Sequence, residues 1–84
     1  MNIILSKFGK KFSNRPMAKQ IFGTVESNSV ITIDLEGVEE VTPSFFHEML
    51  EILVKEKSNT IKISNLSDFL RTQLNKAEAS FVNK

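Results

Sequence analysis

Residues 30–50 read VITIDLEGVEEVTPSFFHEML, and this stretch decides the fold of the 84-residue chain. Residues 30–35 are β-branched or apolar at most positions of both faces, which predicts a central strand covered on two sides. Gly37 then turns the chain. Thr42 is a favourable N-cap and Pro43 a favourable first residue for a helix. We therefore expect a buried strand, an acidic loop and a helix, with any function at the strand-to-helix corner.

Two elements are predicted before this stretch. Residues 2–8 have the apolar and β-branched character of a strand. Residues 9–13 form either a hairpin, with residues 9–11 as its tip and Lys11 and Phe12 as a short second arm, or a simple loop, and the pattern leaves both open. Pro16 then begins an amphipathic helix after two residues that can cap it, Ser13 and Asn14.

The helix that begins after Thr42 runs to about Lys55 and is predicted to have a buried and a solvated face. Its core stripe comprises Phe46, Met49, Leu50 and Leu53, widened by Phe45 and Ile52. Its solvated face comprises His47, Glu48, Glu51 and Lys55. His47 and Glu48 are consecutive and point about 100° apart, so they do not orient each other for general-base catalysis. We therefore expect His47 to be a surface histidine.

Two further elements follow. Residues 60–64 alternate in polarity, which predicts a strand near an edge of the sheet. A last helix begins near Asp68, with Ser67 or Asn65 as its cap. We expect the tail over residues 79–84 to fray.

The order β-α-β-α-β-α predicts one α/β domain over residues 1–84, with a small, mostly parallel or mixed sheet of three to four strands. The chain has no cysteine, which excludes disulfides and thiolate sites. No apolar run is long enough to span a bilayer, and no cleavable signal is visible at the N-terminus. We expect a cytoplasmic protein that does not associate with membranes.

Charge is divided by segment although the net charge is only +1. Residues 1–25 contain bases and no acid, and residues 26–56 contain eight acids and one lysine. Opposite patches suit a charged protein partner or self-association, including a homodimer. The alternative that the N-terminal bases bind nucleic acid weakly is less favoured, because the domain as a whole is not strongly basic. Those bases are Lys7, Lys10, Lys11 and Arg15.

No catalytic constellation is visible, so we expect no enzymatic activity and no cofactor. Asp34 ends the central strand, where open α/β sheets gather functional groups. An alternative function is therefore a small-molecule or nucleotide site near Asp34. The simpler interpretation is that its carboxylate accepts loop N–H groups and shapes the turn.

Thr42 and Ser44 place hydroxyl groups at the start of a helix. A phosphate there would meet free backbone N–H groups and the positive end of the helix dipole. It would also add roughly −1.5 to −2 charge beside several acids, which would change a partner surface sharply. Helix capping by Thr42 alone explains the same residues without modification.

Three segments carry a family resemblance. They read GKKFSNR at residues 9–15, IDLEGV at residues 33–38 and VTPSFFHE at residues 41–48. Their order and spacing resemble those of a bacterial family of small STAS-like domains, over about residues 3–77. The resemblance implies an α/β domain similar to anti-sigma-factor antagonists.

In those antagonists a serine kinase of the histidine-kinase-like ATPase type phosphorylates a serine at the start of the helix after the central strand. By position, Ser44 resembles that serine, although the chain carries Thr42-Pro43-Ser44-Phe45 where the antagonists carry Asp-Ser-Ser-Gly. The leading expectation is a regulatory module that docks a protein partner. The expected contact residues are Asp34, Glu36, Gly37, Glu39, Glu40, His47 and Glu48.

Overall fold

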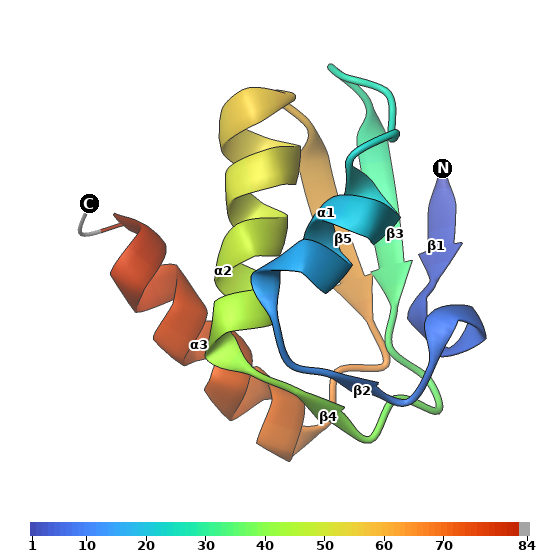
Figure 1. Ribbon diagram of the computed structural model, residues 1–84, viewed down its shortest axis with the longest axis vertical. Coiled ribbons are helices and arrows are strands. Elements are labelled where there is room, and N and C mark those ends of the chain that lie inside the picture. Colours follow the sequence, from blue (N-terminus) through green and yellow to red (C-terminus); the bar gives the residue numbers. More distant parts are fainter. Residues whose placement is uncertain (83–84) are drawn as a thin grey trace.

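A layer of strands and a layer of helices make up the computed structural model, which describes residues 1–82 (Figure 1). Strands β1 (Asn2–Ile4), β3 (Val30–Asp34) and β5 (Thr60–Ser64) form a three-stranded sheet in the order β1-β3-β5. Both neighbouring pairs are parallel. The predicted central strand and the predicted edge strand are confirmed, as is the mostly parallel α/β sheet.

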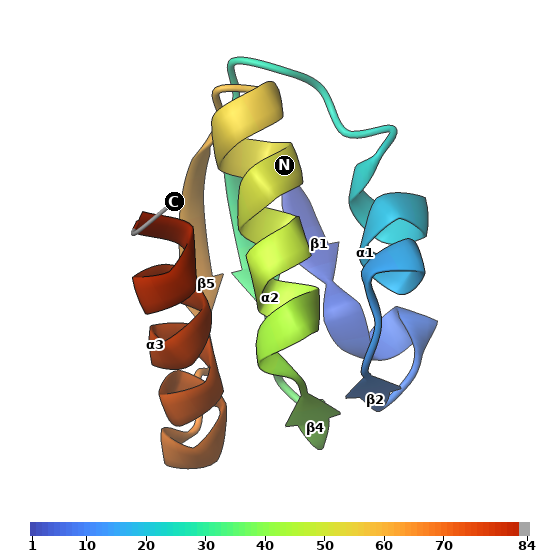
Figure 2. The ribbon, with the colours of Figure 1, turned by 60° about the vertical axis from the view of Figure 1, so that its left-hand side comes forward.

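The helices are α1 (Arg15–Phe22), α2 (Pro43–Leu50) and α3 (Asp68–Val82). After Leu50, α2 continues without a break as a π-helical turn, η2 (Glu51–Glu56). Figure 2 shows α2 over the middle of the sheet, with α1 on one side of it and α3 on the other. This arrangement confirms the predicted order of strands and helices and is that of a STAS-like fold.

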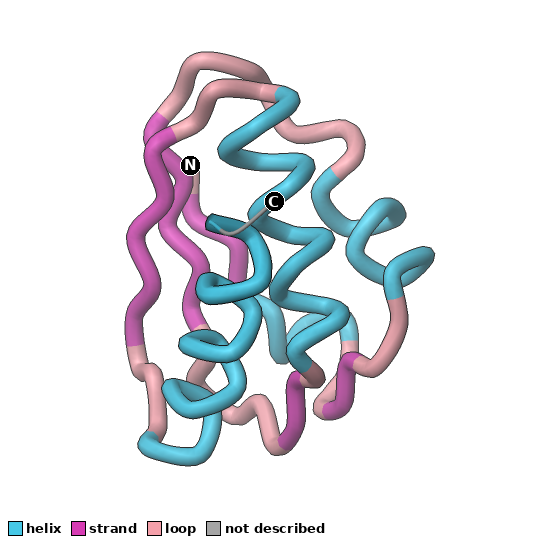
Figure 3. The backbone as a smooth tube through the Cα atoms, turned by 90° about the vertical axis from the view of Figure 1, so that its left-hand side faces the viewer, coloured by secondary structure: helices cyan, strands magenta, loops and turns pink. Residues whose placement is uncertain are grey.

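All three helices cover the same face of the sheet (Figure 3). Along β3, Ile31 and Ile33 are fully buried, whereas Val30 on the opposite face is 51% exposed. The prediction that this strand is covered on two sides is therefore wrong. The three strands follow each other across the sheet in the same order as along the chain. Right-handed connections between them therefore place all the connecting helices on one face of the sheet.

A second, two-stranded parallel sheet lies beyond the main one and was not predicted. It pairs β2 (Lys11–Phe12) with β4 (Glu40–Val41). The predicted first strand ends at Ile4 and continues as a 3-10 turn, η1 (Leu5–Phe8). The segment around β2 is thus neither a hairpin nor a simple loop, because its partner strand is distant in sequence.

An aromatic cluster joins this small sheet to the helices. The ring centroid of Phe45 on α2 lies 5.1 Å from that of Phe12 and 5.9 Å from that of Phe22. All three rings are fully buried. Burial of such rings is among the largest apolar contributions to a small core, so this cluster positions the start of α2 against α1 and β2.

The helix caps decide two alternatives that the sequence left open. Asn14 caps α1, since its side-chain oxygen accepts a hydrogen bond from the backbone N–H of Met17. Ser67 caps α3 in the same way, with the N–H of Leu70 as donor. α3 continues to Val82, past the point where fraying was expected, and residues 83–84 of that expected tail lie outside the described residues. Within the described part of the chain, no helix is long and apolar enough to cross a membrane.

Candidate functional site: the corner between β3 and α2

The loop that leaves β3 is held by Asp34. Its carboxylate Oδ1 accepts hydrogen bonds from the backbone N–H of Glu36 at 2.9 Å and from the side-chain amide of Asn65 at 2.8 Å. The Asn65 amide, and then the Glu36 N–H, hold the pKa of Asp34 below its ordinary value. Asp34 therefore shapes the turn and ties it to the loop after β5, as the simpler interpretation expected.

Gly37 gives the loop its direction. Its φ of 81° lies in the left-handed region, and an added Cβ would lie 3.4 Å from the Cβ of Ser6. Glycine is thus favoured by conformation, whereas the approach of η1 would leave room for a Cβ in ordinary contact. The loop's acidic side chains are exposed on the way to α2, namely Glu36, Glu39 and Glu40.

Thr42 and Ser44 differ in how their hydroxyl groups are used. The hydroxyl of Thr42 accepts a hydrogen bond from the N–H of Phe45 at 3.3 Å and donates one to the carbonyl of Ser13 at 3.1 Å. It is the N-cap of α2. Ser44, in the first turn of the same helix, is exposed. The hydroxyl of Ser44 can therefore be modified without removing the N-cap of α2, whereas that of Thr42 cannot.

Ser44 borders a small hollow of about 110 Å³ between the start of α2 and the face of α3. Two basic side chains, Arg15 and Lys76, line the same hollow together with His47. Among the described residues no carboxylate lines the hollow itself, although Arg15 is paired with Glu48.

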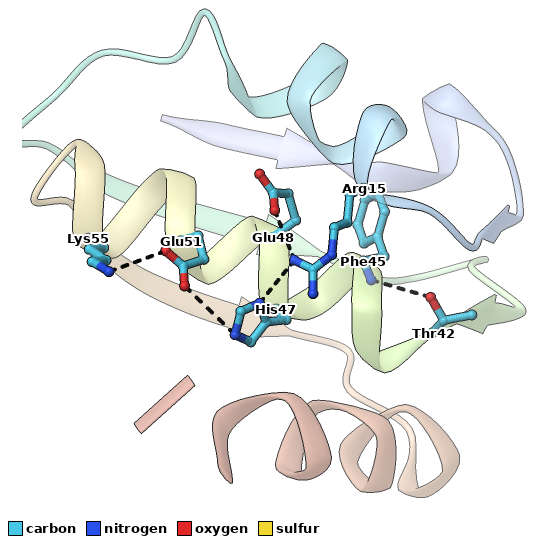
Figure 4. Close-up of polar contacts among 7 residues, drawn as sticks. All are labelled: Arg15, Thr42, Phe45, His47, Glu48, Glu51 and Lys55. Carbon is cyan, nitrogen blue, oxygen red and sulfur yellow. Dashed lines mark hydrogen bonds and ion pairs between the residues drawn. The ribbon is translucent and has the colours of Figure 1, made fainter. Parts of the chain in front are cut away.

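His47 and Glu48 are buried, with only 4% and 8% of their surfaces exposed. The prediction that they form a solvated face, and that His47 is a surface residue, is therefore wrong. Helix α3 covers His47, whose ring lies edge-on to that of Phe81 at 6.0 Å between centroids. On the other side, Arg15 reaches over α2 from the start of α1 (Figure 4).

A single guanidinium nitrogen joins the two buried side chains. Nη1 of Arg15 lies 2.9 Å from Oε1 of Glu48 and 3.1 Å from Nδ1 of His47. Arginine has no acceptor, so Nδ1 accepts and neutral His47 carries its proton on Nε2. Although His47 and Glu48 do not orient each other directly, Arg15 orients both.

The polar row continues along α2. Nε2 of His47 lies 3.8 Å from Oε1 of Glu51, whose other oxygen lies 3.8 Å from the ammonium of Lys55 (Figure 4). In residues 1–82 no three His, Asp or Glu side chains come close enough together to hold a metal ion. The arrangement fixes α2 between its neighbours, and nothing in the sequence spacing pointed to Arg15 as its centre.

The basic and acidic segments face each other within the molecule. Lys10 lies 3.8 Å from Glu39, and Lys11 is paired with Glu40 in the register of β2 and β4. Arg15 forms an ion pair with Glu48. Three of the four bases considered for nucleic acid are therefore placed opposite acids of the same chain, and only Lys7 is left among them.

Fold and site together define a small two-layer α/β domain that presents an exposed turn and helix start. The chain belongs to the family described as a STAS-like domain of unknown function (DUF4325), whose family model matches residues 17–69. The match includes β3, the corner and all of α2. No curated protein and no solved structure matched the chain.

Proposed function

We propose that this domain is a regulatory protein-interaction module that binds a protein partner at the corner and performs no chemistry of its own. The support is geometric: the exposed residues of the loop and helix start at the corner are Glu36, Gly37, Glu39, Glu40 and Ser44. His47 and Glu48 leave the proposed contact set because they are buried. Asp34 holds the loop of this surface in place, because its carboxylate accepts hydrogen bonds from the Glu36 N–H and the Asn65 amide.

We further propose that Ser44 switches this surface. The observation that carries this is the contrast between the exposed Ser44 hydroxyl and the Thr42 hydroxyl, which is committed to two hydrogen bonds. A phosphate on Ser44 would lie at the positive end of α2, beside Arg15 and Lys76. A phosphate on Thr42 would instead remove the helix cap.

The enzyme for this modification is a serine kinase of the histidine-kinase-like ATPase type, acting as the partner or alongside it, with ATP as the phosphate donor. Oγ of Ser44 attacks the γ-phosphorus of ATP, the hydroxyl proton passes to a base of the kinase, and ADP leaves. The product adds a dianion to the corner and changes its fit to a partner by electrostatics rather than by refolding.

The test is affinity capture with the wild-type domain and with Ser44→Ala and Ser44→Asp as baits. A Thr24→Asp bait is the matched control, because Thr24 is exposed and lies at the far end of α1. We expect Ser44→Ala and Thr24→Asp to behave as wild type, and Ser44→Asp to change the affinity for the captured partner by about tenfold, or about 1.4 kcal/mol. If all four baits captured the same partners with the same affinities, the proposed switch at Ser44 would be rejected.

A further inference from the structure

The outer edge of β5 has backbone groups that no strand within residues 1–82 pairs. The N–H of Thr60 bonds to the carbonyl of Ser29, and the N–H of Leu35 bonds to the carbonyl of Ser64. These two bonds determine which residues of β5 face β3, so the residues between them turn the other way. Ile61 and Ile63 therefore direct their N–H and C=O groups away from the sheet, which ends at β5.

An apolar groove runs beside this edge. It is a hollow of about 360 Å³ between β5, the end of α2 and the last turns of α3. Ile61 and Ile63 line it on the strand side, Leu74 and Phe81 line it from α3, and Glu78 adds one carboxylate to the otherwise apolar lining. Both isoleucines are half-buried, so the groove is open to an entering side chain.

Lys62 lies between the two isoleucines and points to the opposite, uncovered face of the sheet. It is exposed, and its neighbours across the sheet are the neutral Thr32 and, beyond it, Asn2. Among the described residues it takes part in no ion pair. The edge thus combines free backbone groups, an apolar groove on one face and an unpaired positive charge on the other.

We propose that β5 accepts an extended segment of another protein as an added antiparallel strand, with apolar side chains in the groove and an acidic side chain opposite Lys62. Added strands gain affinity from main-chain hydrogen bonds and specificity from alternate side chains. An apolar-acidic-apolar segment satisfies both faces of β5 at once. This surface is separate from the corner, and the inference does not depend on the proposed function.

A second copy of the chain fits this edge less well. Antiparallel pairing of β5 with its own copy, in the register that uses both Ile61 and Ile63, would place two Lys62 side chains directly opposite each other. Like charges in that position are destabilising. The other edge of the sheet offers less, because β1 has only three residues before the chain turns into η1.

The probe is an acetylated and amidated peptide, Val-Glu-Val-Glu-Val, titrated into the isotope-labelled full chain and followed by NMR. We expect saturable shifts along β5 and slower hydrogen exchange at the amides of Ile61 and Ile63. In the antiparallel register the valine amides face β5, so methylation of those nitrogens should weaken binding about tenfold. Methylation of the glutamate amides, which point away, is the matched control and should leave the affinity unchanged.

Charge is tested with Lys62→Glu and with Lys7→Glu, an exposed control that changes the net charge equally. Lys62→Glu should weaken binding of the acidic peptide by up to about fivefold and strengthen binding of Val-Lys-Val-Lys-Val by a similar factor. Lys7→Glu should change neither affinity. The proposal is overturned if the acidic peptide shows no saturable binding, or if both methylated peptides bind alike, or if the two charge variants behave alike. Concentration-dependent dimerisation that protects Ile61 and Ile63 without peptide would overturn it in favour of a second copy.

Discussion

Two side chains determine how α2 is anchored. Thr42 ties the first turn to Ser13 and to the N–H of Phe45 through one hydroxyl. Arg15 holds the middle of the helix through His47 and Glu48. Both anchors connect α2 to the segment around the start of α1, so each contributes to the position of the exposed Ser44.

Thr42→Ala should lower the free energy of unfolding by about 1 kcal/mol, because the helix loses its N-cap and Ser13 loses a donor. Thr42→Ser keeps the hydroxyl and should cost less than half as much. Urea unfolding of the two variants and the wild type measures the difference. Equal losses in both variants would show that the threonine methyl group, and not the cap, is responsible.

Arg15 and Glu48 should be energetically coupled. In a double-mutant cycle with Arg15→Met and Glu48→Gln, we expect a coupling of about 1–2 kcal/mol, between the values for exposed and for buried pairs, because Glu48 is nearly buried and Arg15 is half exposed. The matched control is the more exposed Lys10 and Glu39 pair, with Lys10→Met and Glu39→Gln. That pair should show little or no coupling, and a coupling equal to the first would contradict the role assigned to burial.

At the scale of the elements, the corner is defined by contacts between loops rather than by the helix alone. Asp34 at the end of β3 is bonded to Asn65 just after β5, so the two loops at this end of the sheet act together. Asn65 adopts a positive φ of 57°. This conformation suits asparagine, and it places the amide where it can reach the carboxylate.

This contact should make stability depend on pH. The Asn65 amide and the Glu36 N–H favour the ionised form of Asp34, so its folded pKa lies below the ordinary 3.8. The carboxylate therefore stabilises the fold above pH 3.8, and this contribution is lost as the pH falls through the folded pKa. Asn65→Gly removes the amide while tolerating the positive φ.

We expect wild type to be more stable than Asn65→Gly at pH 6, and the difference to shrink as the pH falls below the ordinary carboxyl value. Urea midpoints of both proteins between pH 6 and pH 2 measure it. Asp34→Asn should remove most of the same pH dependence. A difference that is constant over the whole range would mean that Asn65 acts without Asp34.

At the scale of the whole molecule, the sheet has one covered and one open face. α2 lies between two helices and has no solvated face in its middle, whereas every second residue of β3 is at least partly exposed. The helix has neighbours on three sides, namely the sheet, α1 and α3. The exposed surface of the domain consequently comprises the corner, the open sheet face, the edge of β5 and the outer faces of α1 and α3.

Alanine substitutions at neighbouring positions of β3 should differ in their effect on the free energy of unfolding, because the two side chains lie on opposite faces of the sheet. Ile31→Ala removes a fully buried side chain and should cost about 2–5 kcal/mol. Val30→Ala, at a half-exposed position on the open face, should cost less than about 1 kcal/mol. Thermal or urea unfolding measures both. Large losses at both positions would show that something covers the outer face in solution.

Much of the fold was predictable because its signals are local. Strand and helix periodicity, the proline after Thr42 and the capping residues all act within a few positions of the chain. They placed β3, α2 and the corner correctly, and the core stripe of α2 is buried as expected. The turn at Asp34 was also anticipated, since it is formed by residues two positions apart.

By itself, then, the sequence determined the order of the elements, the central strand and the site of the corner. The tertiary structure alone decided that His47 and Glu48 are buried, that the sheet is covered on one face, and that Lys11 and Phe12 pair with a strand distant in sequence. Each of these depends on contacts between distant segments, such as those from Arg15 to residues 32 and 33 positions further on. Periodicity identifies a helix's apolar stripe, but the number of neighbours around that helix is set only when the whole chain packs.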